Sequence, residues 1–267
     1  DGSTDSTCKI IDEFCKVNDN FIRLKSGTCG GAKSNFLYML KEIGVQFKYC
    51  MFCDQDDVWL PDKLFCAANH LKDSVPIAYH SNVTIVDEQL NVLGNRFKPD
   101  FEPNLQFPEF FFDSVALGCT MVFNSTLLKI VKQHILDEPT QHDAYVYVLA
   151  YLFGQCFYDS DSHILYRRHT SATSGFGKVK DASRPTLIDR YKKYKKGPKN
   201  QFSIRAQQLL NGYSSQLRLK DLRFLKLVAN YRENLMNKLL LLCSQESHAS
   251  GMRKTLQIKY RILANTL

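Results

Sequence analysis

The sequence predicts an α/β fold, in which helices cover a mixed sheet, followed by a helical C-terminal region. Two observations lead to this prediction. Through residue 170, short apolar runs of strand length alternate with segments that have helical spacing, which is typical of an α/β sandwich. The charge then changes: residues 178–267 hold 20 Lys and Arg against 5 Asp and Glu, a net charge of +15, whereas residues 1–177 hold 15 against 22, a net charge of −7. We therefore expect one domain over residues 1–177 and a basic helical region over residues 178–267.

The composition is that of a globular protein with reduced thiols. Of its 267 residues, 44% are hydrophobic, which is ordinary for a folded chain with an ample core. No apolar run approaches the ~20 residues needed to span a bilayer. The nine cysteines have no disulfide-scaffold spacing and no signal-peptide pattern accompanies them, so we expect a cytoplasmic protein. Cys50 and Cys53 form a CxxC, but no second pair follows, so zinc is not expected there.

The central stretch is an apolar run that ends in a cluster of carboxylates. Residues 47–53 are rich in aromatic and apolar side chains and predict a strand buried on both faces of a largely parallel sheet. Asp54, Asp56 and Asp57 follow directly. Like charges this close repel one another unless a cation lies among them, so they predict a site for Mg²⁺ or Mn²⁺. The alternative is a solvated acidic turn before a helix that starts at Pro61.

The other elements are predicted from periodicity and from capping residues. One long helix is expected over residues 217–243, with its leucines on one face. The aromatic run 107–112 is expected to form a short helix that serves either as a hydrophobic plug or as a shelf for a sugar ring. Further helices are expected to begin near Ser6, Gly31, Pro61, Ser125, Ala144 and Leu256, further strands over residues 21–24, 76–87, 118–124 and 164–169, and a turn over residues 91–94.

Polar residues and glycines lie at the ends of several of these elements. Lys33 and Asn35 open a helix, where they could offset phosphate charge and fix a loop, or could simply be a surface lysine and a cap. Gly118 leads into a strand, where a residue without Cβ permits close approach. His142 and Asp143 stand at a helix start, either as a cap or as a reactive carboxylate that the helix N-terminus keeps ionised.

The segment Asp-Gln-Asp-Asp-Val-Trp at residues 54–59, followed by Leu-Pro-Asp-Lys-Leu, closely resembles the metal-binding segment of family 2 glycosyltransferases, in particular the rhamnosyltransferase-like branch. Other stretches resemble the family in the same order through residue 175: Asp-Gly-Ser-Thr-Asp at residues 1–5, the Gly-x-x-x-Asn of residues 31–35, the His142–Asp143 pair, and Tyr-Arg-Arg-His at residues 166–169. The chain departs from the family at Asn82, where an Asp is common, and at residues 170–175, which are usually rich in Asn. The family places a strand, a helix and a second strand before residue 1, and we expect this chain to lack them.

The resemblance implies a glycosyltransferase A-type fold, a Rossmann-like nucleotide-diphospho-sugar transferase domain, and inverting, metal-dependent sugar transfer. It assigns the catalytic base to Asp143, the Mg²⁺ or Mn²⁺ ligands to Asp54, Asp56, Asp57 and His169, and donor contacts to Asp1, Gly31, Lys33, Asn35, Asp54 and Gly118. With one base and a metal-bound diphosphate leaving group, a single in-line displacement is expected.

The branch also implies partners. The donor would be dTDP-rhamnose, and the acceptor a saccharide or lipid-linked saccharide in cell-surface polysaccharide synthesis. The basic C-terminal helices are expected to cover the catalytic half, to pair with a second subunit as a homodimer, or to lie on the anionic inner face of the cell membrane. No nucleic acid is expected as a partner.

Two other functions are compatible with parts of the sequence. A catalytically inactive nucleotide-sugar-binding protein would fit the absent first elements, and it would bind donor without turnover. A basic nucleic-acid-binding protein would fit residues 178–267, but it leaves the carboxylate cluster unexplained.

Overall fold

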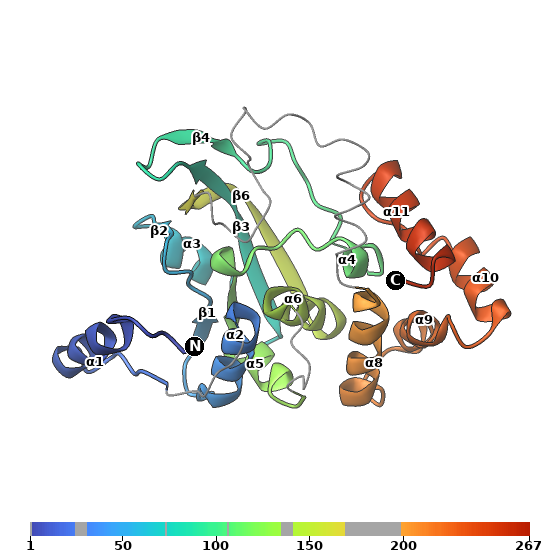
Figure 1. Ribbon diagram of the computed structural model, residues 1–267, viewed down its shortest axis with the longest axis horizontal. Helices are drawn as coiled ribbons and strands as arrows, with labels where there is room; N and C mark the ends of the chain where they lie inside the picture. Colours follow the sequence, from blue (N-terminus) through green and yellow to red (C-terminus); the bar gives the residue numbers. More distant parts are fainter. Residues whose placement is uncertain (1, 25–30, 73, 106, 135–140, 169–198) are drawn as a thin grey trace.

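The computed structural model describes residues 2–24, 31–72, 74–105, 107–134, 141–168 and 199–267 (Figure 1). A mixed sheet lies at its centre, with strand order β1-β5-β3-β6-β2 and β4 paired to β3. Only β3 and β6 are paired in parallel among the described strands, and the other pairs are antiparallel. The strands are β1 (Tyr49–Met51), β2 (Val58–Trp59), β3 (Ile77–Val86), β4 (Val92–Asn95), β5 (Val122–Asn124) and β6 (Gln155–Arg167).

Helices cover this sheet and extend beyond it on one side (Figure 1). Those of the first part of the chain are α1 (Thr7–Val17), α2 (Ala32–Glu42), α3 (Lys63–His70), α4 (Glu109–Phe112), α5 (Ser125–Val131) and α6 (His142–Phe153), with a 3₁₀ turn, η1 (Gly118–Thr120). The C-terminal helices are α8 (Gln201–Tyr213), α9 (Leu219–Asn230), α10 (Leu235–Cys243) and α11 (Met252–Leu263).

Helix α6 is the centre of the packing. It is apolar around nearly its whole circumference, with buried residues from His142 to Leu152, as expected for a helix enclosed on all sides. It lies between the sheet and α8 (Figure 1), and the hydroxyl groups of Tyr145 on α6 and Tyr213 on α8 are 3.3 Å apart. The same hydrophobic cluster continues into the C-terminal helices through Phe224 and Leu225. Helices α8 and α9 therefore share one core with the sheet-forming part of the chain.

The aromatic run 107–112 belongs to this core. Phe110 and Phe111 are 1% and 0% exposed, and the Phe111 ring contacts Phe202 on α8 and Phe224 on α9. The run is therefore a hydrophobic plug beneath the C-terminal helices, and the expectation of a sugar shelf there is wrong.

The α/β prediction is confirmed, and several local predictions need correction. Residues 21–24 form no strand, and the expected turn at residues 91–94 is largely strand β4. The sheet is less parallel than the strand at residues 47–53 suggested, because β1 pairs antiparallel with β5. Asn124, not Ser125, caps α5, because its side chain accepts a hydrogen bond from the Leu127 amide at 2.9 Å.

The expected single helix over residues 217–243 is two helices. Asn234 interrupts it by capping α10, where its side chain accepts from the Asn237 amide at 2.8 Å. Helix α8 and the first half of β6 were not predicted.

Across the described residues, no helix combines the length and the apolar composition required to cross a membrane.

Candidate active site

The end of β1 and the turn η1 bring two carboxylates and a thiol together. Asp54 and Asp57 lie in the turn between β1 and β2, and Cys119 lies in η1. One ligand atom from each of these residues lies within 4.8 Å of the other two. Asp56 is not a member of this group, although its charge acts on both Asp54 and Asp57. Of the predicted metal ligands, Asp54 and Asp57 therefore converge directly.

The end of β6 holds the acidic turn in place. The Arg167 amide donates to Asp57 Oδ1 at 3.0 Å, and the Arg167 guanidinium donates to the Asp56 carbonyl at 2.8 Å. Asp57 Oδ2 is buried and has no hydrogen-bond partner among the described residues. A buried carboxylate oxygen that lacks a donor is costly unless a cation approaches it. Asp57 Oδ2 and the nearby carboxylate of Asp54 could therefore bind a divalent metal ion together.

A buried lysine lies on the other side of the cluster. Lys63, the first residue of α3, is 2% exposed, and its Nζ donates to the Cys119 carbonyl at 2.7 Å. The ammonium also lies 5.0 Å from the centroid of the Trp59 ring. Burial lowers the pKa of Lys63, and the nearby Cys119, Cys53 and Asp57 oppose that shift. Lys63 therefore ties α3 to η1 and places one positive charge beside the carboxylates.

Burial and mutual repulsion make the acidic cluster receptive to a cation. Burial, followed by the charges of Asp57, Asp56 and Asp143, raises the pKa of Asp54 to about 6. Burial also raises the pKa of Asp57, although the Arg167 amide and the Cys119 thiol oppose that shift. The pKa of Cys119 is well above its usual value for the same reasons. A divalent ion would relieve this repulsion.

Gly118 brings the start of α6 against the same site. A Cβ at Gly118 would lie 2.9 Å from His142 Nε2 and 3.5 Å from the Asp143 Cβ. His142 cannot easily move, because it is stacked on Phe36 at 4.2 Å and edge-on to Phe52 at 4.6 Å. Position 118 therefore requires glycine, because a larger residue would collide with His142. Asp143 Oδ1 accepts from the Ala144 amide at 2.7 Å, and its charge acts on Asp54.

Helix α2 supplies the residues predicted to approach the donor. Gly31 has a φ of +107° at the start of α2, in a region that favours glycine. Lys33 is exposed, and its charge acts on His142. The Asn35 side-chain oxygen is buried without a hydrogen-bond partner among the described residues. The first turn of α2 therefore borders the His142–Asp143 end of the site.

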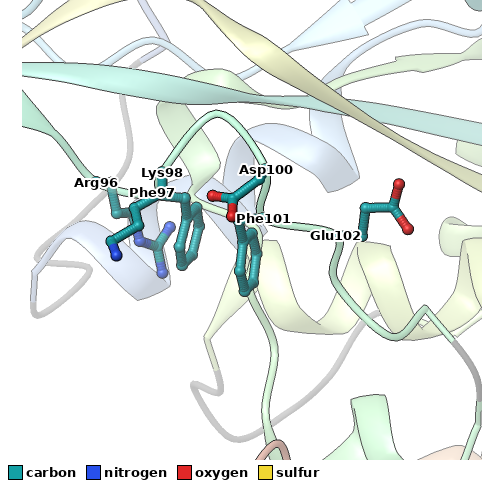
Figure 2. A pocket seen from close by; sticks show the side chains of 6 residues that line it. All are labelled: Arg96, Phe97, Lys98, Asp100, Phe101 and Glu102. Carbon is teal, nitrogen blue, oxygen red and sulfur yellow. The ribbon is translucent and has the colours of Figure 1, made fainter.

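An open pocket of about 600 Å³ is lined by the segment that follows β4 (Figure 2). The rings of Phe97 and Phe101 are stacked with centroids 4.1 Å apart. Burial lowers the pKa of Arg96, which also lines the pocket, to about 10, and Cys119 and Asp143 are among the groups that oppose this shift. One residue of the pocket wall therefore lies within electrostatic reach of Asp143. The residues that line it are Arg96, Phe97, Lys98, Asp100, Phe101 and Glu102.

Comparison with known proteins identifies the family. The family described as Glycosyl transferase family 2 matches residues 1–138, more than half of the chain. The chain belongs to glycosyl transferase family 2. It is also 28% identical over 185 residues to a protein of Shigella flexneri described as dTDP-rhamnosyl transferase RfbG. That alignment covers 66% of this chain and 63% of the relative, so the chain matches less than two thirds of the relative's length.

The family confirms the resemblance found in the sequence and the A-type α/β fold with a helical C-terminal part. Asp54 and Asp57 converge with Cys119, and the neighbouring Gly118 lies against His142 and Asp143. Asp1 and His169, predicted to contact the donor and the metal, lie outside the described residues. The boundary expected between residues 177 and 178 lies outside them as well.

Cys119, Lys63 and Arg167 were missed as site residues. A signal for Lys63 was present, because it lies one helical turn before the buried Ala67 and therefore on the inner side of α3. No comparable signal pointed to Cys119, which meets Asp57 only through the fold. Asn82, the departure from the family pattern, is explained by structure: its amide donates to the Phe97 and Ser160 carbonyls at 2.9 and 3.2 Å. A carboxylate could not make these two bonds.

Proposed function

We propose that this member of glycosyl transferase family 2 transfers rhamnose from dTDP-rhamnose to a saccharide acceptor, with inversion and with a divalent metal ion, in the synthesis of cell-surface polysaccharide. The observation that carries the proposal is the convergence of the Asp54 and Asp57 carboxylates, together with the charge of Asp143, which acts on Asp54 from beside Gly118. The similarity to a dTDP-rhamnosyl transferase supports the choice of donor.

Different residues are proposed to act on the leaving group and on the acceptor hydroxyl. Asp54 and Asp57, with their partly buried carboxylates, would hold Mg²⁺ or Mn²⁺, and Asp56 and His169 are proposed to assist them. Such an ion, when bound, neutralises the charge of the diphosphate leaving group. Arg167 positions the acidic turn through its bonds to Asp56 and Asp57.

Asp143 is proposed as the general base. Its place at the N-terminus of α6 favours the ionised carboxylate, which can take the proton from an acceptor hydroxyl. One base opposite a metal-bound leaving group leads to a single displacement, and hence to inversion at the anomeric carbon. Asp1, Gly31, Lys33 and Asn35 are proposed to contact the nucleotide and its diphosphate, and the missing Cβ of Gly118 is proposed to serve the donor site by letting His142 and Asp143 approach.

The pocket after β4 is proposed to hold the acceptor. Its stacked Phe97 and Phe101 rings offer an apolar surface on which a sugar ring can lie. Lys98 and Asp100 lie beside these rings, Glu102 lies farther along the same segment (Figure 2), and all three can hydrogen-bond to sugar hydroxyls. Its volume of about 600 Å³ is within the range of small-molecule pockets.

The test is metal-dependent transfer by the full natural chain. Purified protein is incubated with dTDP-rhamnose and a panel of oligosaccharides, with and without Mn²⁺, and product is detected by mass spectrometry. We expect Asp57→Asn and Asp143→Asn to lose at least about 100-fold in turnover with folding intact, whereas the exposed control Asp19→Asn keeps full activity. Donor binding without any turnover in the unaltered protein would instead indicate an inactive nucleotide-sugar-binding protein.

A further inference from the structure

A second group of possible metal ligands lies outside the proposed active site, between α3 and β6. Asp62 directly precedes α3, Cys66 lies one turn later in that helix, and His163 lies on β6. One ligand atom from each residue lies within 4.8 Å of the other two. Asp62 and Cys66 are four positions apart, so they occupy the same side of the helix start. Three donor types, oxygen, sulfur and nitrogen, therefore meet at one point.

The distances within the group are close to those of a coordination shell. Asp62 Oδ2 lies 3.0 Å from His163 Nδ1 and 4.0 Å from Cys66 Sγ. Zinc bonds of ~2.0–2.3 Å at tetrahedral angles place ligand atoms roughly 3–4 Å apart. Small rotations of the partly exposed Asp62 and Cys66 side chains would meet this geometry, while the His163 ring stays fixed.

The ring of His163 is already oriented as a metal-bound histidine would be. Its other nitrogen, Nε2, lies 3.2 Å from Asp159 Oδ2, and the Tyr79 hydroxyl donates to the same oxygen at 2.8 Å. The His163 side chain is only 8% exposed. Histidines that bind metals typically place the second ring nitrogen against a carboxylate in this way, which fixes the tautomer and the ring orientation.

The local charge also favours a cation. The charges of Asp62, Asp159 and Asp161 act on the Cys66 thiol. Three carboxylates thus act on one thiol at a half-exposed position. These negative charges would attract a cation bound among the three side chains.

We propose that Asp62, Cys66 and His163 form a zinc site, with water as the fourth ligand and Asp159 as the carboxylate that orients His163. The mixed set of one thiolate, one imidazole and one carboxylate suits Zn²⁺ and disfavours Mg²⁺, which prefers oxygen ligands alone. The site would clamp the start of α3 to β6. Because Lys63 follows Asp62 directly and reaches the Cys119 carbonyl, the same clamp would steady one side of the Asp54–Asp57 cluster.

The experiment measures metal binding and does not depend on sugar transfer. Metal-free full-length protein is titrated with Zn²⁺ against a chromophoric chelator, in excess Mg²⁺ so that the Asp54–Asp57 cluster does not take up Zn²⁺. We expect one equivalent of Zn²⁺ to bind. Cys66→Ser should weaken this binding at least about tenfold, and Asp159→Asn should weaken it roughly 10–100-fold. Co²⁺ in place of Zn²⁺ should give a sulfur-to-cobalt charge-transfer band that Cys66→Ser abolishes.

Cys243→Ser is the matched control, because Cys243 is an exposed thiol on α10, at a distance from α3 (Figure 1). It should bind Zn²⁺ and Co²⁺ as the unaltered protein does. Equal Zn²⁺ affinity in Cys66→Ser and the unaltered protein, or an equal loss in Cys243→Ser, would overturn the proposal. In that case the contacts of His163 with Asp62 and Asp159 serve only as a hydrogen-bond network.

Discussion

Asp54 shows how a single side chain can oppose folding and yet favour ligand binding. Its pKa of about 6 in the folded protein lies above its ordinary value of 3.8, chiefly because of burial. The folded state therefore binds the proton more tightly than the unfolded state does. The contribution of this group to stability is present at low pH and is lost as pH rises from about 4 to about 6.

We predict that Asp54→Asn stabilises the metal-free protein at pH 7 by about 1 kcal/mol, after allowance for solvent screening, and weakens Mn²⁺ binding at least about tenfold. Chemical denaturation with and without Mn²⁺ measures both effects. The stabilising effect should vanish at pH 4, where Asp54 is protonated in the unaltered protein. A destabilised Asp54→Asn at pH 7 without metal would contradict this account.

Addition of one methyl group at Gly118 should destabilise the folded protein. The added Cβ in Gly118→Ala would lie 2.9 Å from His142 Nε2, and His142 is confined by Phe36 and Phe52. We expect a loss of about 1–3 kcal/mol in the free energy of unfolding, as for an overpacked core. A double-mutant cycle checks the cause: in a His142→Ala background the cost of Gly118→Ala should be much smaller. An unchanged cost there would mean that the clash is elsewhere.

At the scale of elements, Lys63 couples α3 to η1. Lys63→Met keeps most of the buried stem but removes the charge beside Asp57 and the bond to the Cys119 carbonyl. Because the positive charge of Lys63 no longer repels the cation, Mn²⁺ binding should become about tenfold tighter. Turnover should nevertheless fall about ten- to 100-fold, because η1 carries Gly118 and loses its anchor.

Calorimetric titration with Mn²⁺ and initial-rate measurements separate these two effects of Lys63→Met. Lys129→Met, at an exposed position on α5, is the control and should change neither quantity. Weaker metal binding in Lys63→Met would show that Lys63 organises the carboxylates more than it competes with the cation.

Elements with strong local patterns could be predicted from the sequence, whereas elements defined by their partners could not. Helix α6 and strand β3 have long apolar runs, and both were expected near their observed positions. The first half of β6 reads Gln-Cys-Phe-Tyr-Asp-Ser-Asp-Ser, and it becomes a strand through its pairing with β3. The candidate site shows the same difference. Its carboxylates could be found in the sequence because they are adjacent. Cys119 is 62 positions beyond Asp57, and only the pairing of β5 with β1 brings it close to them.

At the scale of the whole molecule, a buried arginine joins the C-terminal helices to the catalytic part. Arg205 on α8 is 6% exposed, and burial lowers its pKa to about 10 against the opposing charge of Asp143. Its guanidinium lies over the rings of Phe111 and Phe202 and donates to the Phe111 carbonyl at 3.4 Å. The basic region is thus part of the electrostatic surroundings of the proposed base.

We predict that Arg205→Met changes the free energy of unfolding by no more than about 1 kcal/mol. The substitution removes the favourable contacts of the guanidinium, but it also removes the cost of burying a cation, and the two effects offset each other. Transfer should fall about tenfold, because Asp143 loses a favourable charge. Thermal unfolding and initial-rate measurements separate these effects. Arg223→Met, at an exposed position on α9, should match the unaltered protein in both.

The end of the molecule farthest from the sheet is formed by α10 and α11 (Figure 1). These two helices expose many apolar side chains. They are Leu235, Met236, Leu239 and Leu240 on α10, and Met252, Leu256, Tyr260 and Leu263 on α11. Within residues 199–267 there are 12 Lys and Arg against 3 Asp and Glu. Apolar side chains on a basic surface suit an anionic membrane, where a lipid-linked acceptor would also be found.

We predict that the protein sediments with vesicles containing anionic phospholipid and not with purely zwitterionic vesicles, and that 0.5 M salt weakens the binding roughly tenfold or more. Leu240→Glu should reduce binding, because it places a negative charge on the apolar face of α10. Leu93→Glu is a matched control on β4, since Leu240 and Leu93 are 53% and 51% exposed. Equal losses in the two variants would locate the membrane contact elsewhere. A concentration-dependent dimer that Leu240→Glu dissociates, with no vesicle binding, would show that these helices instead pair two copies of the chain.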